Sequence, residues 1–234
     1  MDIKATKRVQ NNVIDGLEKK ALRYLAERQP AWVTSDLLTF IGFLGSLMIG
    51  LGFILTNLNI NWLWLTIAGL FVNWYGDSLD GTLARVRNTQ RPVYGYYLDH
   101  TMDVVNETLM FVSLGFSPLV HLPIALTAFV LYLALTLNVS MNTYLRGEFK
   151  LSYFKLGPTE FRIIVALICL VFIIFPSVSG WARQVTIFGN GYVFGIFDFV
   201  ALTIVALLVI IWVVTIIGDI RYYAKIDPPK KPEE

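Results

Sequence analysis

Charge is scarce in this sequence. Asp, Glu, Lys and Arg make up 15% of the 234 residues, while 56% are hydrophobic, and an average globular domain carries about 25% charged residues. The deficit is concentrated in long uncharged runs, at 37–56, 62–76, 109–145, 163–182 and 200–218. A bilayer core requires about 20 apolar residues per helix. The composition therefore excludes an ordinary soluble domain and predicts a polytopic membrane protein.

Cysteine is nearly absent. The start of the chain also lacks a long apolar segment. The single cysteine, Cys169, cannot form a disulfide within one chain and lies in an apolar run, so we expect it to pack in the core. The first 30 or so residues lack the apolar region of a cleavable signal peptide. Apolar residues recur there at helical spacing instead, at Val13, Ile14, Leu17, Ala21, Leu22 and Leu25. This pattern predicts an amphipathic helix in the cytoplasmic interface, which could serve simply as a topogenic anchor.

The uncharged runs predict six transmembrane helices in an all-α fold. The run at 109–145 is too long for one helix and contains Pro118 and Pro123, so we divide it into two helices with a turn between them. The predicted spans are 36–56, 61–85, 95–117, 121–145, 159–179 and 192–220. We expect three parts: a cytoplasmic arm with the interfacial helix at 1–32, the six-helix catalytic domain at 33–222 and a cytoplasmic tail at 223–234.

The basic residues predict the orientation of these spans. Of the 19 Lys and Arg residues, all except Arg183 fall in the two termini or in the second-to-third and fourth-to-fifth connections. The positive-inside rule makes that side cytoplasmic. Both termini are then cytoplasmic, as an even number of spans requires. Such a surface attracts lipid headgroups and phosphates, and we expect no nucleic-acid partner.

Four aspartates interrupt the apolar pattern between residues 77 and 103. A carboxylate at membrane depth costs about 2.5–3.5 kcal/mol or more, so a cluster of them needs compensation. Asp77 and Asp80 are three residues apart on one helix. Asp99 and Asp103 are four apart on the next, so each pair shares a helix face. The short connection makes the two helices antiparallel neighbours, which brings all four carboxylates to their cytoplasmic ends. Hard oxygen ligands of this kind suit Mg²⁺ or Mn²⁺, and four carry enough charge for two ions.

Small residues and one arginine accompany the carboxylates. Gly81 leaves room for a ligand or a neighbouring backbone, and Ala84 keeps the same wall small. Arg85 lies eight residues after Asp77 on the carboxylate face, where it could form a salt bridge or bind a phosphate. We favour the phosphate, because metal ions would already balance the carboxylates. Gly95 is expected to permit close packing against the preceding helix, with a ligand contact as the alternative.

Together these residues form the pattern Asp-x2-Asp-Gly-x2-Ala-Arg, nine further residues, then Gly-x3-Asp-x3-Asp. The pattern resembles the signature of the CDP-alcohol phosphotransferase (CDP-alcohol phosphatidyltransferase) family, and every fixed position is met. With the six-span topology, the resemblance covers residues 33–222. It implies an integral membrane enzyme that transfers a phospho-alcohol from a CDP-alcohol to an acceptor hydroxyl, releases CMP and commonly forms homodimers.

The resemblance also implies roles by position. It makes the two-ion Mg²⁺ or Mn²⁺ ligands Asp77, Asp80, Asp99 and Asp103. Asp103 would in addition be the general base for the acceptor hydroxyl, while Gly81 and Arg85 would contact the nucleotide and diphosphate. The family often has Pro-Asn-x2-Thr before the first span, and here Ser35-Asp36-Leu37-Leu38-Thr39 stands instead. Thr39 is thus a candidate substrate contact and Asp36 a weaker one, with capping of the first span by Ser35 or Asp36 equally open.

Other polar residues of the spans carry two interpretations each. Asn73 could line the site or bond a neighbouring helix, and Glu107 could reach the pocket or pair with a basic residue. His100 follows Asp99, as in the choline and ethanolamine branch of the family, but packing is the preferred interpretation. The basic residues around the fourth-to-fifth connection are candidate anion contacts or ordinary flanking charge. They are Arg146, Lys150, Lys155 and Arg162.

The leading hypothesis is a phospholipid-synthesis enzyme that uses CDP-diacylglycerol and a small polar acceptor. A CDP-choline or CDP-ethanolamine phosphotransferase with a diacylglycerol-like acceptor is the alternative, because the motif covers only the CDP part. An intramembrane prenyltransferase also uses aspartates and magnesium, but it lacks the Asp-Gly-x2-Ala-Arg run. A divalent-cation transporter is the hypothesis from a different class, since it too needs buried acids. Dependence on CDP separates these hypotheses.

Overall fold

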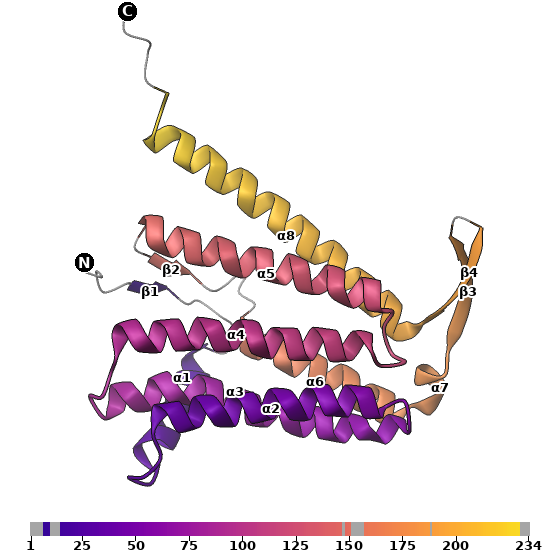
Figure 1. Ribbon diagram of the computed structural model, residues 1–234, viewed down its shortest axis with the longest axis horizontal. Helices are drawn as coiled ribbons and strands as arrows, with labels where there is room; N and C mark the ends of the chain where they lie inside the picture. The colour runs from indigo at the N-terminus through magenta and orange to yellow at the C-terminus, as the bar shows by residue number, and fades with distance from the viewer. Residues whose placement is uncertain (1–6, 10–14, 147, 151–156, 188, 230–234) are drawn as a thin grey trace, which may run out of the picture.

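The computed structural model describes residues 7–9, 15–146, 148–150, 157–187 and 189–229, which are mostly helical (Figure 1). Six long helices occur among the described residues. They are α2 (Ser35–Leu55), α3 (Leu63–Val86), α4 (Pro92–Gly115), α5 (Leu122–Arg146), α6 (Pro158–Ile174) and α8 (Ile196–Ile226). The shorter helical elements are α1 (Asp15–Glu27), the 3₁₀ turn η1 (Ile60–Trp62) and α7 (Pro176–Ser179).

Each predicted span coincides with one long helix, with shifts at some ends. Helix α4 begins at Pro92 rather than at 95, because proline is well suited to the first helical position. Helix α6 ends at Ile174, shortly before Pro176. Helix α8 begins at Ile196 rather than at 192, because the preceding residues form a strand.

The expectation of a purely α-helical fold overlooked two small sheets. Strands β3 (Ala182–Ile187) and β4 (Asn190–Gly195) form an antiparallel hairpin between α7 and α8. Strands β1 (Lys7–Val9) and β2 (Glu148–Lys150) pair in parallel. Strands of three to six residues are too short to form an apolar run of membrane length, so the hydropathy pattern does not reveal them.

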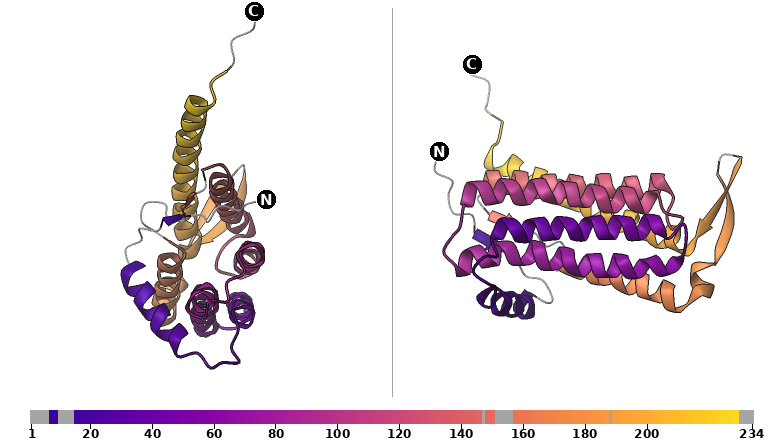
Figure 2. Two further views of the ribbon diagram at one scale, coloured as in Figure 1. Left: turned by 90° about the vertical axis from the view of Figure 1, so that its left-hand side faces the viewer. Right: turned by 60° about the horizontal axis from the view of Figure 1, so that its bottom comes forward.

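The long helices form one elongated bundle. Helices α2, α3 and α4 lie side by side, α6 packs on α3, and α5 lies between α4 and α8 (Figures 1 and 2). Helix α8 inclines away from the other helices towards its C-terminal end. The β3–β4 hairpin projects at one end of the bundle, here called the hairpin end. The β1–β2 pair lies at the opposite end, here called the β1 end.

Polar side chains cap the N-terminal ends of α2 and α6. The Thr34 hydroxyl accepts a hydrogen bond from the Leu37 backbone N–H at 3.2 Å and caps α2. The expected cap at Ser35 or Asp36 was therefore wrong. The Glu160 carboxylate accepts from the Gly157 N–H at 3.0 Å at the start of α6.

Helices α2 and α3 form the most extensive helix pair, and their backbones touch through glycine. A Cβ atom added to Gly76 would collide with the Gly42 backbone and the Leu38 carbonyl oxygen. A Cβ added to Gly45 would collide with the backbone of Asn73. Small residues allow such approach in membranes, where van der Waals packing and interhelical hydrogen bonds hold helices together. The position of Asn73, and with it the polar part of α3, is thereby fixed against α2.

Helix α1 packs at the β1 end of the bundle. Its Leu22 and Ala26 are buried in a small cluster with residues of α2 and α3. The Glu18 carboxylate accepts hydrogen bonds from Trp74 Nε1 at 2.9 Å and Thr159 Oγ1 at 2.6 Å. Leu17, in contrast, is 75% exposed. Location of α1 in a membrane interface stays a prediction, and Val13 and Ile14 lie outside the described residues.

The larger apolar core lies towards the hairpin end. It includes Ile49 and Phe53 of α2, Leu70 of α3 and Phe172 of α6. Cys169 is 1% exposed in the same cluster, which confirms its predicted packing role. This core packs the helices together on the hairpin side of the polar residues of α3 and α4.

Three of the described helices are long and apolar enough to cross a membrane: α2, α5 and α8. Helices α3 and α4 are less apolar because they carry the aspartates, and α6 is shorter, with 17 residues. The protein is thus a membrane protein by its apolar helices, while the count of six spans stays a prediction.

We expect Gly76→Ala to lower the free energy of unfolding by about 1–3 kcal/mol, because the added methyl group forces α2 and α3 apart. Alanine is otherwise the better helix former by about 1 kcal/mol. Gly218→Ala in α8 is the matched control, since its Cβ would meet no heavy atom within 4 Å. Thermal unfolding in detergent measures both, and a Gly76→Ala protein as stable as Gly218→Ala would contradict the close contact.

Candidate active site

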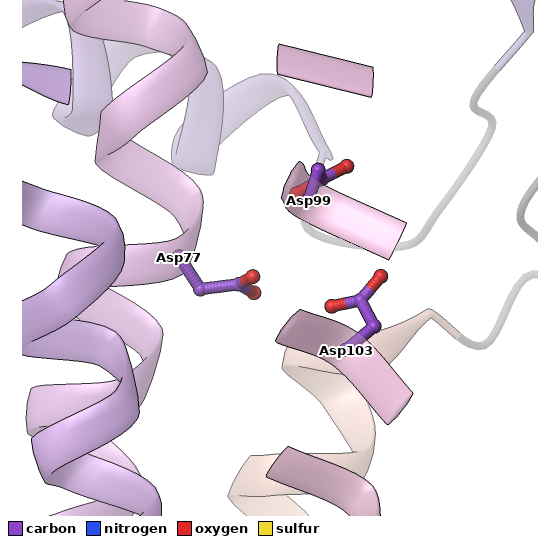
Figure 3. Close-up of side chains that lie close together, drawn as sticks. All are labelled: Asp77, Asp99 and Asp103. Atoms are coloured by element: carbon purple, nitrogen blue, oxygen red, sulfur yellow. The ribbon is translucent and has the colours of Figure 1, made fainter. Parts of the chain in front are cut away.

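Three aspartates from two helices meet near the β1 end of the bundle. Asp77 lies on α3, and Asp99 and Asp103 lie one turn apart on α4. Carboxylate oxygens of the three residues lie within 4.8 Å of one another. Figure 3 shows the Asp77 side chain pointing from its helix towards the other two. The predicted convergence across antiparallel helices is thus found for these three residues, here called the Asp cluster.

Asp80 lies beside the Asp cluster but faces α2. Its Oδ2 accepts a hydrogen bond from Thr39 Oγ1 at 2.6 Å, and its Oδ1 accepts from the Gly81 N–H. The Ser35 hydroxyl donates to its backbone carbonyl at 2.8 Å. Asp77 and Asp99 are near enough to act on its charge. The structure therefore groups three of the four predicted ligands, and Asp80 as a ligand stays a prediction.

A guanidinium from α6 neutralises part of the Asp cluster. Arg162 Nη2 donates to Asp77 Oδ2 at 2.6 Å, and the side chains of this pair are only 16% and 23% exposed. Arg162 Nε donates to Asn73 Oδ1 at 2.9 Å. From the sequence, Arg162 was interpreted as a candidate anion contact or as ordinary flanking charge. Its position in the first turns of α6 was visible, but the pairing depends on how α6 packs against α3.

Asn73 bonds to neighbouring helices, which confirms the interhelical interpretation. Its Nδ2 donates to the Gly42 carbonyl and to Ser46 Oγ of α2, each at 3.0 Å. Its Oδ1 faces Arg162 and hence the site. The side chain is fully buried. Asn73 therefore joins α2, α3 and α6 immediately next to Asp77.

Gly81 and Arg85 are neighbours in space as well as in sequence. A Cβ added to Gly81 would lie 3.4 Å from Arg85 Nη1. Arg85 Nη2 donates to Thr82 Oγ1 at 2.9 Å, and the side chain is exposed. Ala84 is partly buried, and its carbonyl accepts from the Thr89 N–H where α3 ends. Roles of these residues in substrate binding stay predictions.

Asp36 and Gly95 lie at the rim of the site. Asp36 Oδ2 is 3.4 Å from Arg91 Nη1 and 3.5 Å from the Tyr94 hydroxyl, in an exposed contact between α2 and α4. A Cβ added to Gly95 would meet no heavy atom within 4 Å. The expected packing role of Gly95 against the preceding helix was therefore wrong, and its predicted ligand contact remains untested.

Glu107 extends the row of Asp99 and Asp103 by one more turn towards the hairpin end. Its Oε2 is buried and has no hydrogen-bond partner among the described residues. Asp77 and Arg162 are its charged neighbours, and the partly buried Tyr132 of α5 lies within reach of the same charges. Both interpretations of Glu107, a position at the pocket and a pairing with a basic residue, therefore stay predictions. Tyr132 was missed because nothing in its apolar run distinguishes it.

His100 is held by its own helix. Its Nδ1 lies 3.1 Å from the Tyr96 carbonyl oxygen, and the two rings are 4.1 Å apart. Its contact with Asp99 is longer, at 3.7 Å. These contacts favour the packing interpretation over a role in binding substrate.

The basic residues of the fourth-to-fifth connection divide between two places. Arg146 pairs with Asp219 of α8 at 2.6 Å, and its guanidinium lies over the Tyr222 ring. Asn138 and Asn142 donate to the same carboxylate. Arg146 thus ties α5 to α8 rather than facing the Asp cluster. Lys155 and the side chain of Lys150 lie outside the described residues.

The donor set of the Asp cluster fits a hard divalent cation. Carboxylate oxygens are the ligands that Mg²⁺ and Mn²⁺ prefer. Three carboxylates this close repel one another when they are ionised, and Arg162 offsets part of this repulsion through its ion pair with Asp77. A cation at the cluster would relieve the repulsion that remains.

Fold and site together define a helical membrane protein with a carboxylate cluster at one end of its helix bundle. The family model for CDP-alcohol phosphatidyltransferase matches residues 32–219. The chain belongs to the CDP-alcohol phosphatidyltransferase family. It is accordingly a transferase that moves a phospho-alcohol from a CDP-alcohol. Comparison with curated proteins finds no matching relative.

We expect Asp103→Asn to stabilise the protein in the presence of a chelator, because it removes one charge from a self-repelling cluster. Two carboxylates about 5 Å apart repel by roughly 3 kcal/mol at an effective dielectric constant of about 20. Arg162 offsets part of this, so we expect a gain of about 1–2 kcal/mol. The midpoint of thermal unfolding in detergent with EDTA measures it.

Asp219→Asn is the matched control for this measurement. Its carboxylate is paired with Arg146, so the same substitution there should lower the midpoint. A lower midpoint for Asp103→Asn as well would contradict net repulsion within the Asp cluster.

Proposed function

We propose that this protein transfers a phosphatidyl group from CDP-diacylglycerol to the hydroxyl of a small polar acceptor and releases CMP. The observation that carries the proposal is the convergence of Asp77, Asp99 and Asp103 within a chain of this family. A single compact membrane domain favours CDP-diacylglycerol as donor. The packing of His100 on Tyr96 weakens the Asp99-His100 pair as an argument for the choline and ethanolamine branch.

The proposed ion ligands are the four motif carboxylates, Asp77, Asp80, Asp99 and Asp103. Two Mg²⁺ or Mn²⁺ ions bound there would supply positive charge to the diphosphate and to the leaving CMP. Three of these carboxylates are already grouped. Thr39 orients the fourth by donating to Asp80, so its predicted substrate contact becomes a positioning role as well.

Asp103 is proposed as the general base. Its carboxylate takes the proton of the acceptor hydroxyl, and the acceptor oxygen forms a bond to the β-phosphorus of the donor. The bond between that phosphorus and the bridging oxygen breaks, and the bridging oxygen leaves with CMP. Arg85 contacts the diphosphate, and Gly81 leaves space for it. The remaining proposed substrate contacts are Asp36, Ala84 and Gly95.

The proposed topology has six spans, formed by α2, α3, α4, α5, α6 and α8. A helix of 17 residues such as α6 is at the short end of what a bilayer requires. The β1 end, with the site and α1, then faces the cytoplasm, and the hairpin end with Arg183 faces outward. We further propose a homodimer.

We expect purified protein in detergent to release CMP from CDP-diacylglycerol when Mg²⁺ or Mn²⁺ and a hydroxyl acceptor are present. Donors are offered separately, as CDP-diacylglycerol, CDP-choline and CDP-ethanolamine, each with a panel of acceptors. Release from a CDP-aminoalcohol alone would replace the proposed donor by the other branch. Absence of both CMP release and CDP binding, with divalent-ion flux in liposomes, would favour a transporter.

We expect Asp103→Asn to lower the rate of transfer by about 10²–10⁴-fold or more while leaving nucleotide binding largely intact, because only the proton acceptor is lost. Asp77→Asn should weaken metal-dependent nucleotide binding itself. Rates of CMP release and binding of a CDP-containing donor separate these two effects. Equal activity of Asp103→Asn and wild type would refute the assignment of the base.

A further inference from the structure

The guanidinium of Arg162 forms an ion pair with Asp77, one of the carboxylates proposed to bind the ions. It donates to Asp77 Oδ2 at 2.6 Å from a different helix, and both side chains are largely buried. A charge-assisted hydrogen bond of this length is among the stronger interactions in proteins. Any cation that binds through Asp77 must compete with it.

The guanidinium is held in this place from its other side. Arg162 Nε donates to Asn73 Oδ1 at 2.9 Å, while Asn73 Nδ2 is bonded to the Gly42 carbonyl and Ser46 Oγ. Asn73 is fully buried where α2 and α3 touch through glycine. The buried side-chain amide of Asn73 therefore fixes the orientation of the Arg162 guanidinium, which points at Asp77.

The surroundings of Arg162 are acidic on more than one side. Asp77 and Asp103 act on its charge, and it acts in turn on Glu107 and the Tyr132 hydroxyl. These groups come from α3, α4 and α5, while Arg162 itself comes from α6. The guanidinium thus pairs with one member of the Asp cluster, and the other two carboxylates come from the neighbouring helix α4.

We propose that Arg162 is a positioning residue that serves as the internal counter-ion of the cation-free site and gives up Asp77 when a divalent ion binds. The inference rests on the proposed function, which makes the Asp cluster a cation site. Arg162 keeps the carboxylates together before loading and lowers the affinity of the site for the ion. Release of Asp77 leaves Arg162 tethered to Asn73.

The test is Mn²⁺ binding to the full-length protein in detergent after chelator treatment, followed by the spectroscopic signal of free Mn²⁺. Arg162→Gln should bind Mn²⁺ at least about tenfold more tightly than wild type, because the ion no longer has to displace a charge-assisted hydrogen bond from Asp77. Its unfolding midpoint in EDTA should fall, because Asp77 loses its partner, while the Mn²⁺-loaded midpoints of the two proteins should lie close together.

The matched control is Arg146→Gln. It breaks another Arg–Asp ion pair with a distance of 2.6 Å, which joins α5 to α8 and does not involve the Asp cluster. It should leave Mn²⁺ affinity unchanged. If Arg162→Gln does not fold, Arg162→Lys carries the test. Lysine keeps the charge but has no fork to join Asn73 and Asp77, so Mn²⁺ should bind a few-fold more tightly.

The outcomes distinguish failure of the counter-ion role of Arg162 from failure of the proposed cation site. Mn²⁺ affinity equal to or weaker than wild type in the tested Arg162 variant overturns the counter-ion role. Absence of Mn²⁺ binding in wild type, or binding that survives Asp77→Asn, overturns the cation site itself. Tighter binding in Arg162→Gln that Asp77→Asn abolishes supports both.

Discussion

The cost of placing several carboxylates together among apolar helices governs this molecule. The carboxylate oxygens of Asp77, Asp99 and Asp103 lie within 4.8 Å of one another, so positive charge nearby stabilises the ionised cluster. Arg162 supplies part of it from a third helix, α6, and the site chemistry fits a divalent ion for the rest. Much of the polar structure around the cluster follows from this requirement, including the buried Asn73 that directs the guanidinium.

The contact between α2 and α3 gives that polar structure a fixed frame. Glycines at the helix crossing let the two backbones touch, so Asn73 can bond to the α2 backbone rather than to a mobile side chain. Thr39 of the same helix holds Asp80 in place. Some of the hydrogen bonds that orient this region therefore come from outside the motif, from Thr39 and Asn73, and they depend on the close packing of α2 against α3.

The six long helices could be predicted because each contains all or part of an uncharged apolar run, and such runs have few alternatives in a membrane. Their ends were less predictable, since they depend on local features such as Pro92 and the strand before α8. The β3–β4 hairpin escaped because its strands carry no membrane-length signal. Gly95 was misjudged because spacing alone does not say whether a neighbouring helix lies within reach.

The sequence by itself determined the membrane class, the helices and the motif that places the chain in its family, because these depend on composition and on spacing along one helix. Only the tertiary structure decided which carboxylates meet, that Asp80 turns to Thr39, and that Arg162 faces Asp77 while Arg146 faces Asp219. Those outcomes depend on how helices distant in sequence rotate against one another. A rotation of one helix by one residue position turns a side chain by about 100°, which local sequence patterns do not specify.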